Sequence, residues 1–501
     1  MSGAAPVSDR LPLGMRVRLT PSTARSDGGR TLYGGTPARV LYLLPYAAGL
    51  LAHTNEIEVV NRRTGDLARL LVDDGLASPV LSPTLPGVPE LADVTVVVPV
   101  KDRARPLARL LASLPTELKV VVVDDGSSDG SPADTAQRAG AIVLRHEECR
   151  GPAAARNTGL SAVTTPFVAF LDSDVVPRSG WLQTLLVHFA DPAVGLVAPR
   201  IVALDDLPPE GAAARWLTAY EKARSSLDLG PTPALVVPRG PVSYVPSACL
   251  VGRVTAVRDG FDEALRVAED VDLVWRCVEA GWRVRYEPAS EVAHEHRVNT
   301  EQWLRRKAFY GTGAALLARR HHGALAPAVM APWTAVSVAA ILCQRRWSIP
   351  VAVAASGTAV WRISRRLHRS EHPVRGAARL VPYGLVSAAW QTAGLLTRHW
   401  WPAAVIGALV SRRVRRAVIA AAILEGLADW RRVRAEQPLL PYIAAHRLDD
   451  LAYGAGLWSG AAKARTLAPL LPDLGLRRQF GGRHPSGSGA SKKVTPVAPN
   501  L

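Results

Sequence analysis

The chain has 501 residues, a formal net charge of +17 and four cysteines. This length exceeds what one compact core uses, so two or three domains are expected. The cysteines are widely scattered, which excludes a zinc-finger spacing and a disulfide scaffold and favours a reducing compartment. The first residues show no basic stretch followed by an apolar one, so no secretory signal is expected.

The positive charge has a distinctive placement. Arg412, Arg413, Arg415 and Arg416 stand beside apolar runs instead of in a polar tail. That placement favours an anionic lipid surface over nucleic acid. No zinc-finger or helix-turn-helix signature accompanies the charge, so no nucleic-acid partner is expected.

Residues 11–80 predict a small module of a strand and helices. An alternating stretch begins it, and apolar helical patterns follow at 37–51 and 64–77. Thr64 is expected to cap the second helix at its N-terminus, and Gly75 is expected to cap its C-terminus.

The Pro-rich residues 82–90 predict a linker, and from Val94 the pattern changes. Short continuous apolar runs alternate with helix-length segments, which is typical of a parallel α/β sheet covered on both faces. In such sheets ligands bind at the carboxyl ends of the strands. Four acids stand at such ends: Asp124, Asp125, Asp172 and Asp174.

The composition changes again after about residue 320. Residues 325–343 carry no charge and are just long enough to cross a bilayer, and residues 380–397 are similar. We therefore expect an apolar helical region over 320–475 that is membrane-embedded or membrane-lying, with a soluble helical bundle as the alternative. The expected location is the cell membrane, with the catalytic domain on the cytoplasmic side. Residues 476–501 are expected to be disordered.

The spacing of two acids predicts a cation site. Asp172 and Asp174 are two residues apart at a strand end, so both carboxylates can turn toward one point. There they could share a divalent cation with a phosphorylated ligand. For a motif this short, a solvated turn rich in Asp is the alternative.

Three further segments carry polar groups suited to a site. Arg156 opens a helix in "GPAAARNTGL", which suits an anionic group. Asp270 lies in the first turn of a predicted helix, where it is favoured by the macrodipole or is only a cap. His294 and His296 are two apart, so they are either a surface pair or ligands of a metal that carboxylates also bind.

These motifs, in this order, resemble the family 2 glycosyltransferases of the GT-A fold. The segments "VVVDDGSSDG", "FLDSDVVP" and "EDVDLVWR" carry the resemblance, which covers about residues 92–300. It implies an α/β catalytic domain over residues 92–310 that uses a nucleotide-diphosphate sugar and inverts the anomeric carbon.

The resemblance also implies roles on the nucleotide side of the site. Pro99 and Asp125 would line the pocket for the base and ribose, with Asp124 nearby. Arg156 would lie against the nucleotide. Carboxylates at a strand end would accept hydrogen bonds from the base and ribose.

On the reacting side the resemblance implies a cation and a base. Asp172 would lie by the ribose and the cation, while Asp174 and His294 would bind that cation, Mg or Mn. Asp270 would be the catalytic base that takes the proton of the acceptor hydroxyl.

The flanking sequence narrows the resemblance. Residues 1–85 are similar to the small winged-helix domains that recognise peptides, and with the rest of the chain they resemble the glycosyltransferases of the mycofactocin system. This implies UDP-glucose as donor, a peptide-derived redox cofactor as acceptor and a β-1,4-linked oligosaccharide as product. Two alternatives remain: a membrane-associated family 2 transferase acting on a lipid or cell-wall glycan, and a nucleotide-sugar or peptide carrier without catalysis.

Overall fold

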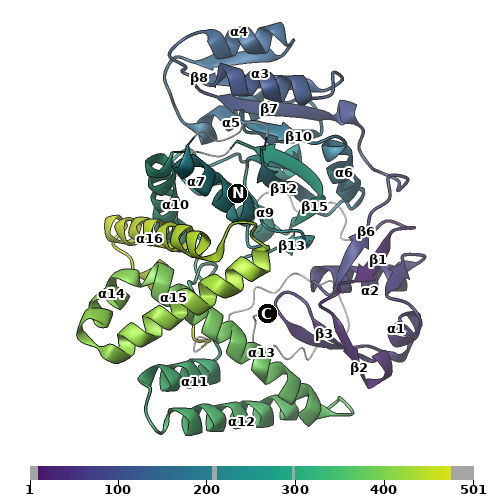
Figure 1. Ribbon diagram of the computed structural model, residues 1–501. Coiled ribbons are helices and arrows are strands. Elements are labelled where there is room, and N and C mark those ends of the chain that lie inside the picture. Colours follow the sequence, from purple (N-terminus) through teal and green to yellow (C-terminus); the bar gives the residue numbers. More distant parts are fainter. Residues whose placement is uncertain (1–9, 206–210, 296–298, 476–501) are drawn as a thin grey trace. The chain divides into compact units, whose positions relative to one another are not determined.

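The computed structural model describes residues 10–205, 211–295 and 299–475, and its contacts divide the chain into two compact units (Figure 1). The first unit comprises residues 1–17, 58–73 and 78–300, and the second comprises residues 18–57, 74–77 and 301–501. The domain boundaries expected from the sequence stay a prediction. The expected disorder of the C-terminal tail and the imidazole of His296 lie outside the described residues.

Within the described residues the first unit is built on a nine-stranded sheet. Its order is β11-β15-β12-β14-β10-β7-β8-β9, and β13 pairs with β15. Strands β10, β7, β8 and β9 are parallel to one another, whereas β14 is antiparallel to its two neighbours, β10 and β12. The strands are β7 (Val94–Val100), β8 (Lys119–Asp125), β9 (Ile142–His146), β10 (Phe167–Leu171), β11 (Val175–Pro177), β12 (Val194–Ala203), β13 (Ala234–Val236), β14 (Cys249–Arg253) and β15 (Arg283–His294).

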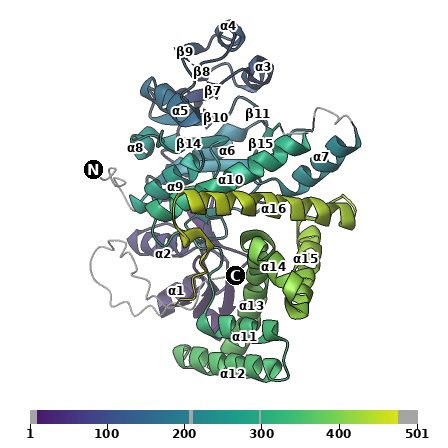
Figure 2. The same cartoon turned by 90° about the vertical axis from the view of Figure 1, so that its left-hand side faces the viewer.

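Helices cover both faces of this sheet, which is why β7 and β8 are continuous apolar runs. Leu107 and Leu110 of α3 join Val96 and Val98 in the core on one face, and α5 packs on the other (Figure 2). A Cβ on Gly159 of α5 would lie 2.3 Å from a methyl carbon of Val97, so only glycine fits there. The helices of this unit are α2 (Arg62–Asp73), α3 (Ala104–Ser113), α4 (Ser131–Arg138), α5 (Pro152–Ser161), α6 (Trp181–Leu186), α7 (Ala212–Arg224), α8 (Val254–Val257) and α9 (Glu269–Glu279). The α/β expectation with a GT-A sheet is confirmed.

The N-terminal segment contributes to both units. One sheet has the order β5-β1-β6 and consists of β1 (Arg16–Leu19), β5 (Glu56–Glu58) and β6 (Ala77–Val80). A second sheet has the order β2-β3-β4 and consists of β2 (Ala24–Ser26), β3 (Thr31–Gly34) and β4 (Arg39–Tyr42). The first half of the predicted helix at 37–51 is wrong, because β4 pairs with β3 and α1 covers only Pro45–Leu50. Pairing with a neighbouring strand outweighed the local apolar pattern.

The cap predicted for α2 is also wrong, by three residues. Asn61 precedes the helix and its side-chain Oδ1 accepts from the backbone N–H of Thr64 at 3.1 Å. The hydroxyl of Thr64 accepts in return from the backbone N–H of Asn61 at 3.1 Å. This reciprocal arrangement is a capping box, in which Thr64 is the third helical residue. Gly75 follows the helix with φ at +69°, as expected of a C-terminal cap.

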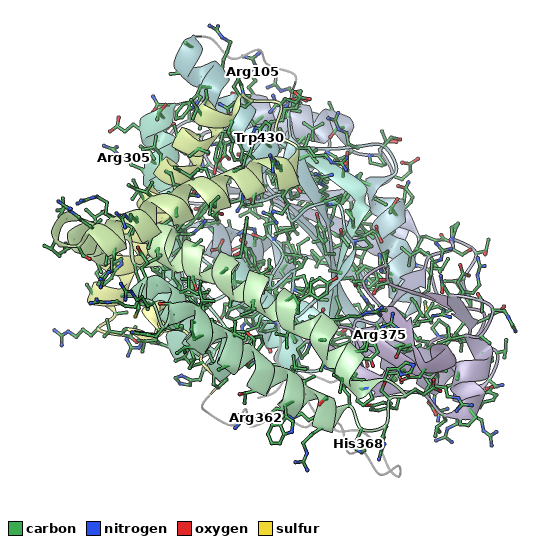
Figure 3. All side chains as sticks on the ribbon, turned by 60° about the horizontal axis from the view of Figure 1, so that its bottom comes forward. Arg105, Arg305, Arg362, His368, Arg375 and Trp430 are labelled. Carbon is green, nitrogen blue, oxygen red and sulfur yellow. The ribbon has the colours of Figure 1, made fainter. Side chains whose placement is uncertain are left out.

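Within the second unit the chain from Glu301 onward is mainly helical (Figure 3). The helix expected over 325–343 is shorter than predicted, because α11 begins only at Pro332. No helix among the described residues combines the length and apolarity that a membrane crossing requires. The helices are α10 (Thr300–Arg320), α11 (Pro332–Cys343), α12 (Ser348–Arg366), α13 (Pro373–Gly394), α14 (Trp401–Val410), α15 (Arg412–Val433) and α16 (Leu439–Lys463).

Two helices of the second unit approach very closely. A Cβ on Gly456 of α16 would lie 1.7 Å from the carbonyl oxygen of Ala308 in α10. Next to this contact the buried ammonium of Lys307 forms an ion pair with Asp449 at 3.1 Å. Small residues and a buried ion pair therefore fix how α10 and α16 pack.

Candidate active site

The carboxyl end of β8 holds the first two acids. Asp125 accepts from the His146 ring Nδ1 at 2.7 Å and from the backbone N–H groups of Arg150 and Gly151 at 2.9 and 2.8 Å. Burial acts to raise the pKa of Asp125, but these hydrogen bonds outweigh it and the pKa lies below its ordinary value. Asp125 is therefore ionised and holds the loop that leads into α5.

Asp124 is fully buried beside it. One carboxylate oxygen accepts from the backbone N–H of Ser127 at 2.9 Å, and the other lies 3.6 Å from Nε of Arg145. Pro99 lies on β7, opposite Val123 of β8. Asp124 and Pro99 thus belong to the same end of adjacent parallel strands as Asp125.

The sequence reasoning missed His146. This side chain connects Asp125 to the hydroxyl of Thr158 in α5, at 2.9 Å from its Nε2. A signal was present, because His146 ends β9 directly opposite Asp125 in the parallel register. A polar residue at the end of a neighbouring strand was the clue.

The carboxyl end of β10 holds Asp172 and Asp174. The carboxylate of Asp174 lies 3.6 Å from Nε2 of His294, the last residue of β15, which pairs antiparallel with β11. The guanidinium of Arg103, just before α3, contacts the other oxygen of Asp174. Asp174 and His294 are therefore brought together as the sequence reasoning expected, with an additional cation beside them.

Arg156 lies between two acids. Its guanidinium donates to Asp172 at 2.6 Å and to Glu269 at 3.2 Å, and it lies over the ring of Phe261 at 5.3 Å. The side chain is only 4% exposed. Its described ion pairs are thus with the site's own carboxylates, and it joins the end of β10 to the start of α9.

Asp270 lies in the first turn of α9, partly enclosed, next to Glu269. Burial raises the pKa of Asp270 to about 7, and the charge of Glu269 acts in the same direction. The positive charge of Arg156 and the backbone N–H of Ser247, at 3.3 Å, oppose this rise. A carboxyl group with this pKa exchanges a proton near neutral pH, which suits a general base.

The contacts tie Asp270 to Asp172. Asp270 accepts from the backbone N–H of Ser247, and Asp172 donates its own backbone N–H to the carbonyl of Ala248 at 3.0 Å. Asp272, one turn into α9, pairs instead with Arg276 at 2.8 Å. The predicted residues of α5, α9 and β15 thus lie around the carboxyl end of β10, whereas Asp272 is held in a structural pair with Arg276.

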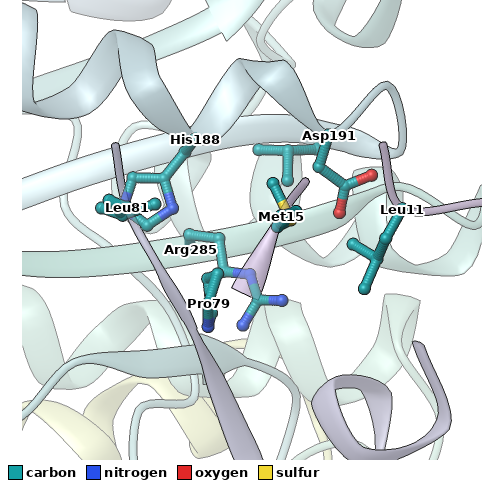
Figure 4. A pocket seen from close by; sticks show the side chains of 8 residues that line it. Leu11, Met15, Pro79, Leu81, His188, Asp191 and Arg285 are labelled. Carbon is teal, nitrogen blue, oxygen red and sulfur yellow. The ribbon is translucent and has the colours of Figure 1, made fainter. Parts of the chain in front are cut away.

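A small cavity elsewhere in this unit is not part of that arrangement. It has a volume of about 10 Å³, room for about one water molecule. His188, Asp191 and Arg285 line it together with Leu11 and Met15 (Figure 4). Asp191 accepts two hydrogen bonds from Arg69, at 2.9 and 2.7 Å, and Nε2 of His188 lies 3.1 Å from Glu287. We interpret this cavity as a packing feature of the fold.

A second group of possible metal ligands lies in the second unit. Glu425, His446 and Asp450 offer ligand atoms within 4.8 Å of one another. Arginine already compensates these acids: Arg447 contacts both carboxylates, and Arg398 lies 3.5 Å from Asp450. We assign this cluster a structural role.

Comparisons with known proteins identify the family of the chain. Residues 95–239 match the family model for glycosyl transferase family 2. The pre-mycofactocin glycosyltransferase of Mycobacterium tuberculosis is 45% identical over 483 residues, which cover 93% of this chain and 99% of that protein. The chain belongs to the family of the pre-mycofactocin glycosyltransferases.

More distant relatives of this glycosyltransferase cover less of it. The succinoglycan biosynthesis protein ExoU of Rhizobium meliloti is 32% identical over 38% of this chain and 59% of its own length. Among solved structures, the mannosyltransferase PcManGT from Pyrobaculum calidifontis, in complex with GDP-Man and Mn²⁺, is 21% identical with a TM-score of 0.35, covering 62% of this chain and 88% of that one.

Proposed function

We propose that this glycosyltransferase transfers glucose from UDP-glucose, with inversion, to a peptide-derived redox cofactor, mycofactocin in its precursor form, and builds a β-1,4-linked oligosaccharide. The acceptor rests on the relative from Mycobacterium tuberculosis, which matches nearly its whole length and is called a pre-mycofactocin glycosyltransferase. The sugar and the linkage rest on the motif resemblance of the sequence.

The donor side is proposed to need a divalent cation, Mg or Mn, held by Asp174 and His294. Their ligand atoms are 3.6 Å apart, and two ligands at right angles about one such ion lie roughly 3 Å apart, so a small shift suffices. One carboxylate and one imidazole leave positions for water and for diphosphate oxygens. When bound, the cation neutralises the negative charge that develops on the leaving diphosphate.

The protein's own part of the chemistry centres on Asp270. The proposal depends on its position in the first turn of α9, next to the carboxylates that Arg156 bridges. A pKa raised to about 7 suits that position, because a base must be ionised before attack yet accept a proton during it. Asp270 takes the proton of the acceptor hydroxyl as that oxygen attacks the anomeric carbon. Arg156 donates hydrogen bonds to both Glu269 and Asp172 and so holds these two carboxylates in place.

The test uses the whole purified chain. Incubation with UDP-glucose, UDP-galactose, UDP-GlcNAc and GDP-mannose, each with Mn²⁺ or Mg²⁺ and a peptide-derived acceptor, is followed by mass spectrometry of the products. A mass increase of one or more hexoses with UDP-glucose alone supports the donor. Transfer from another donor, or none from UDP-glucose, contradicts it.

The alternative acceptor is a lipid or cell-wall glycan, which the exposed apolar side chains of α12 and α14 favour. Deleting residues 1–85 cannot distinguish the two acceptors, since Arg69 forms a buried ion pair with Asp191 and its loss would destabilise the catalytic unit. A direct competition can. With both acceptors in one reaction, labelled glucose is expected in the peptide-derived product, and label in the lipid would favour the alternative.

A further inference from the structure

Two helix junctions of the second unit form one surface. The turn between α11 and α12 and the turn between α14 and α15 are joined by a hydrogen bond of 2.8 Å, from the side-chain amide of Gln344 to the carbonyl of Arg413. We call this surface, residues 341–349 with residues 405–416, the two-junction patch.

Large apolar side chains are exposed on the two-junction patch. Exposure reaches 73% for Ile349, 76% for Leu409 and 83% for Val410. On α14 the exposed apolar positions are 405, 406, 409 and 410, a spacing that puts them on one face of the helix. Ile341 and Trp347 are exposed on the other junction. A soluble protein exposes single apolar residues freely, but a cluster on two adjoining turns marks an interaction site.

Arginines flank these apolar side chains directly. Between Gln302 and Leu424 the sequence contains one carboxylate side chain, Glu371, so the local field is positive. Beyond the patch, Arg362 and His368 project from the end of α12 (Figure 3). The exposed arginines of the patch are Arg345, Arg346, Arg412, Arg413, Arg415 and Arg416.

We propose that the two-junction patch docks the enzyme on the surface of a bilayer that contains anionic phospholipids. Apolar side chains next to guanidinium groups match the depth at which an interface changes from acyl chains to phosphates, and Trp347 suits the headgroup level. Nucleic acid would engage the arginines but leave Leu409 and Val410 in water. A lipid surface uses both kinds of group.

The test is vesicle flotation of the full chain. Binding is expected to vesicles of phosphatidylcholine mixed with phosphatidylglycerol, to be much weaker to phosphatidylcholine alone, and to fall with salt because screening weakens surface charge pairs. Each arginine near an anionic bilayer strengthens binding about fivefold. A variant with four changes is therefore expected to bind at least a hundredfold more weakly: Arg412→Gln, Arg413→Gln, Arg415→Gln and Arg416→Gln.

Two further variants separate the contributions. Leu409→Ser with Val410→Ser should weaken binding at least tenfold while the melting temperature stays unchanged, because both side chains are exposed. The control loses the same charge from exposed arginines of the first unit and should float like wild type: Arg62→Gln, Arg63→Gln, Arg105→Gln and Arg138→Gln.

Three outcomes of the flotation experiment would overturn the proposal. The wild type does not float with anionic vesicles, it binds neutral vesicles equally well, or the control variant loses as much binding as the variant of the patch arginines. Self-association that disappears in the Leu409→Ser, Val410→Ser variant, without vesicle binding, would identify the patch as a contact between copies of the chain. If the chain binds DNA but not vesicles, and the Leu409→Ser, Val410→Ser variant still binds DNA, the patch would be assigned to nucleic acid. Sugar transfer to a soluble acceptor is measured in parallel, so a failure here is distinct from a failure of the proposed activity.

Discussion

Both units of this glycosyltransferase contain a cluster of partly or fully buried acids with a histidine, and the two clusters differ in how their negative charge is compensated. In the second unit, Glu425 and Asp450 share Arg447, and His446 lies 3.3 Å from Glu425. Burial acts to raise the pKa of Glu425, but the hydrogen bond from His446 and the charge of Arg447 outweigh it and lower the pKa. Glu425 is therefore ionised, and both Glu425 and Asp450 are in contact with Arg447.

In the first unit the compensation is incomplete. Arg156 forms ion pairs with Glu269 and Asp172, while Asp270 has no such pair described, and its pKa is raised to about 7. A group of acids therefore does not by itself identify a site. Asp270, whose pKa is raised by burial and by the negative charge of Glu269, is the carboxylate that can exchange a proton during a reaction.

Asp270→Asn is expected to have the largest effect on activity. A general base contributes roughly 10²- to 10⁴-fold, so sugar transfer should fall by about that factor while UDP binding by calorimetry stays unchanged. The wild-type rate should rise with pH through about 7 and then level off, because only ionised Asp270 accepts the proton. Transfer by the Asn variant at the wild-type rate would refute the role.

The same substitution should stabilise the fold in a pH-dependent way. The folded pKa of about 7 lies above the ordinary 3.8, so the stability that protonated Asp270 contributes is present below 3.8 and is lost as pH rises through about 7. Asp270→Asn should therefore melt at a higher temperature than wild type at pH 8, with the difference shrinking toward pH 5. An equal difference at both pH values would contradict the raised pKa.

Arg156→Leu tests the bridge between the acids. Removing one partner of a buried ion pair costs about 3–5 kcal/mol, which chemical denaturation measures. The charge of Arg156 lowers the pKa of Asp270, so the pH midpoint of any remaining activity should move upward. Arg156→Lys is the matched control, which keeps the charge and should retain the midpoint better. An unchanged midpoint in both variants would contradict the electrostatic link.

Glu425→Gln tests the structural cluster in the same terms. Stability at pH 7 should fall by about 1–3 kcal/mol while sugar transfer is unchanged. Because the pKa of Glu425 is lowered, its contribution is present above the ordinary value of 4.5 and is lost as pH falls through the folded pKa, so the difference from wild type should vanish in acid. Loss of Mn²⁺ binding in this variant would show a metal site instead.

The smallest expected effect is that of Glu269→Gln. The charge of Glu269 helps to raise the pKa of Asp270, so its removal should move the pH midpoint of transfer downward. The rate at high pH should change only a few-fold, since Asp270 is ionised there in either protein. A midpoint that moves upward would show that the partnership with Arg156 matters more than the like charge.

Much of the fold followed from local patterns. Continuous apolar runs such as Val94–Val100 gave the central strands, because strands covered on both faces need them. Only the first half of the helix predicted at 37–51 is wrong, because pairing of β4 with β3 is a long-range interaction that a helical apolar pattern does not reveal. The N-cap predicted at Thr64 is wrong because Asn61, three residues earlier, also has a side chain suited to capping and occupies that position.

The sequence by itself determined that acids end the strands of an α/β sheet and which family the chain belongs to. Only the tertiary structure decided which acid stays poised for proton transfer. The reason is that a pKa depends on burial and on charges that are distant in the chain: Arg156 and Glu269 are 113 residues apart, yet they set the state of Asp270 together.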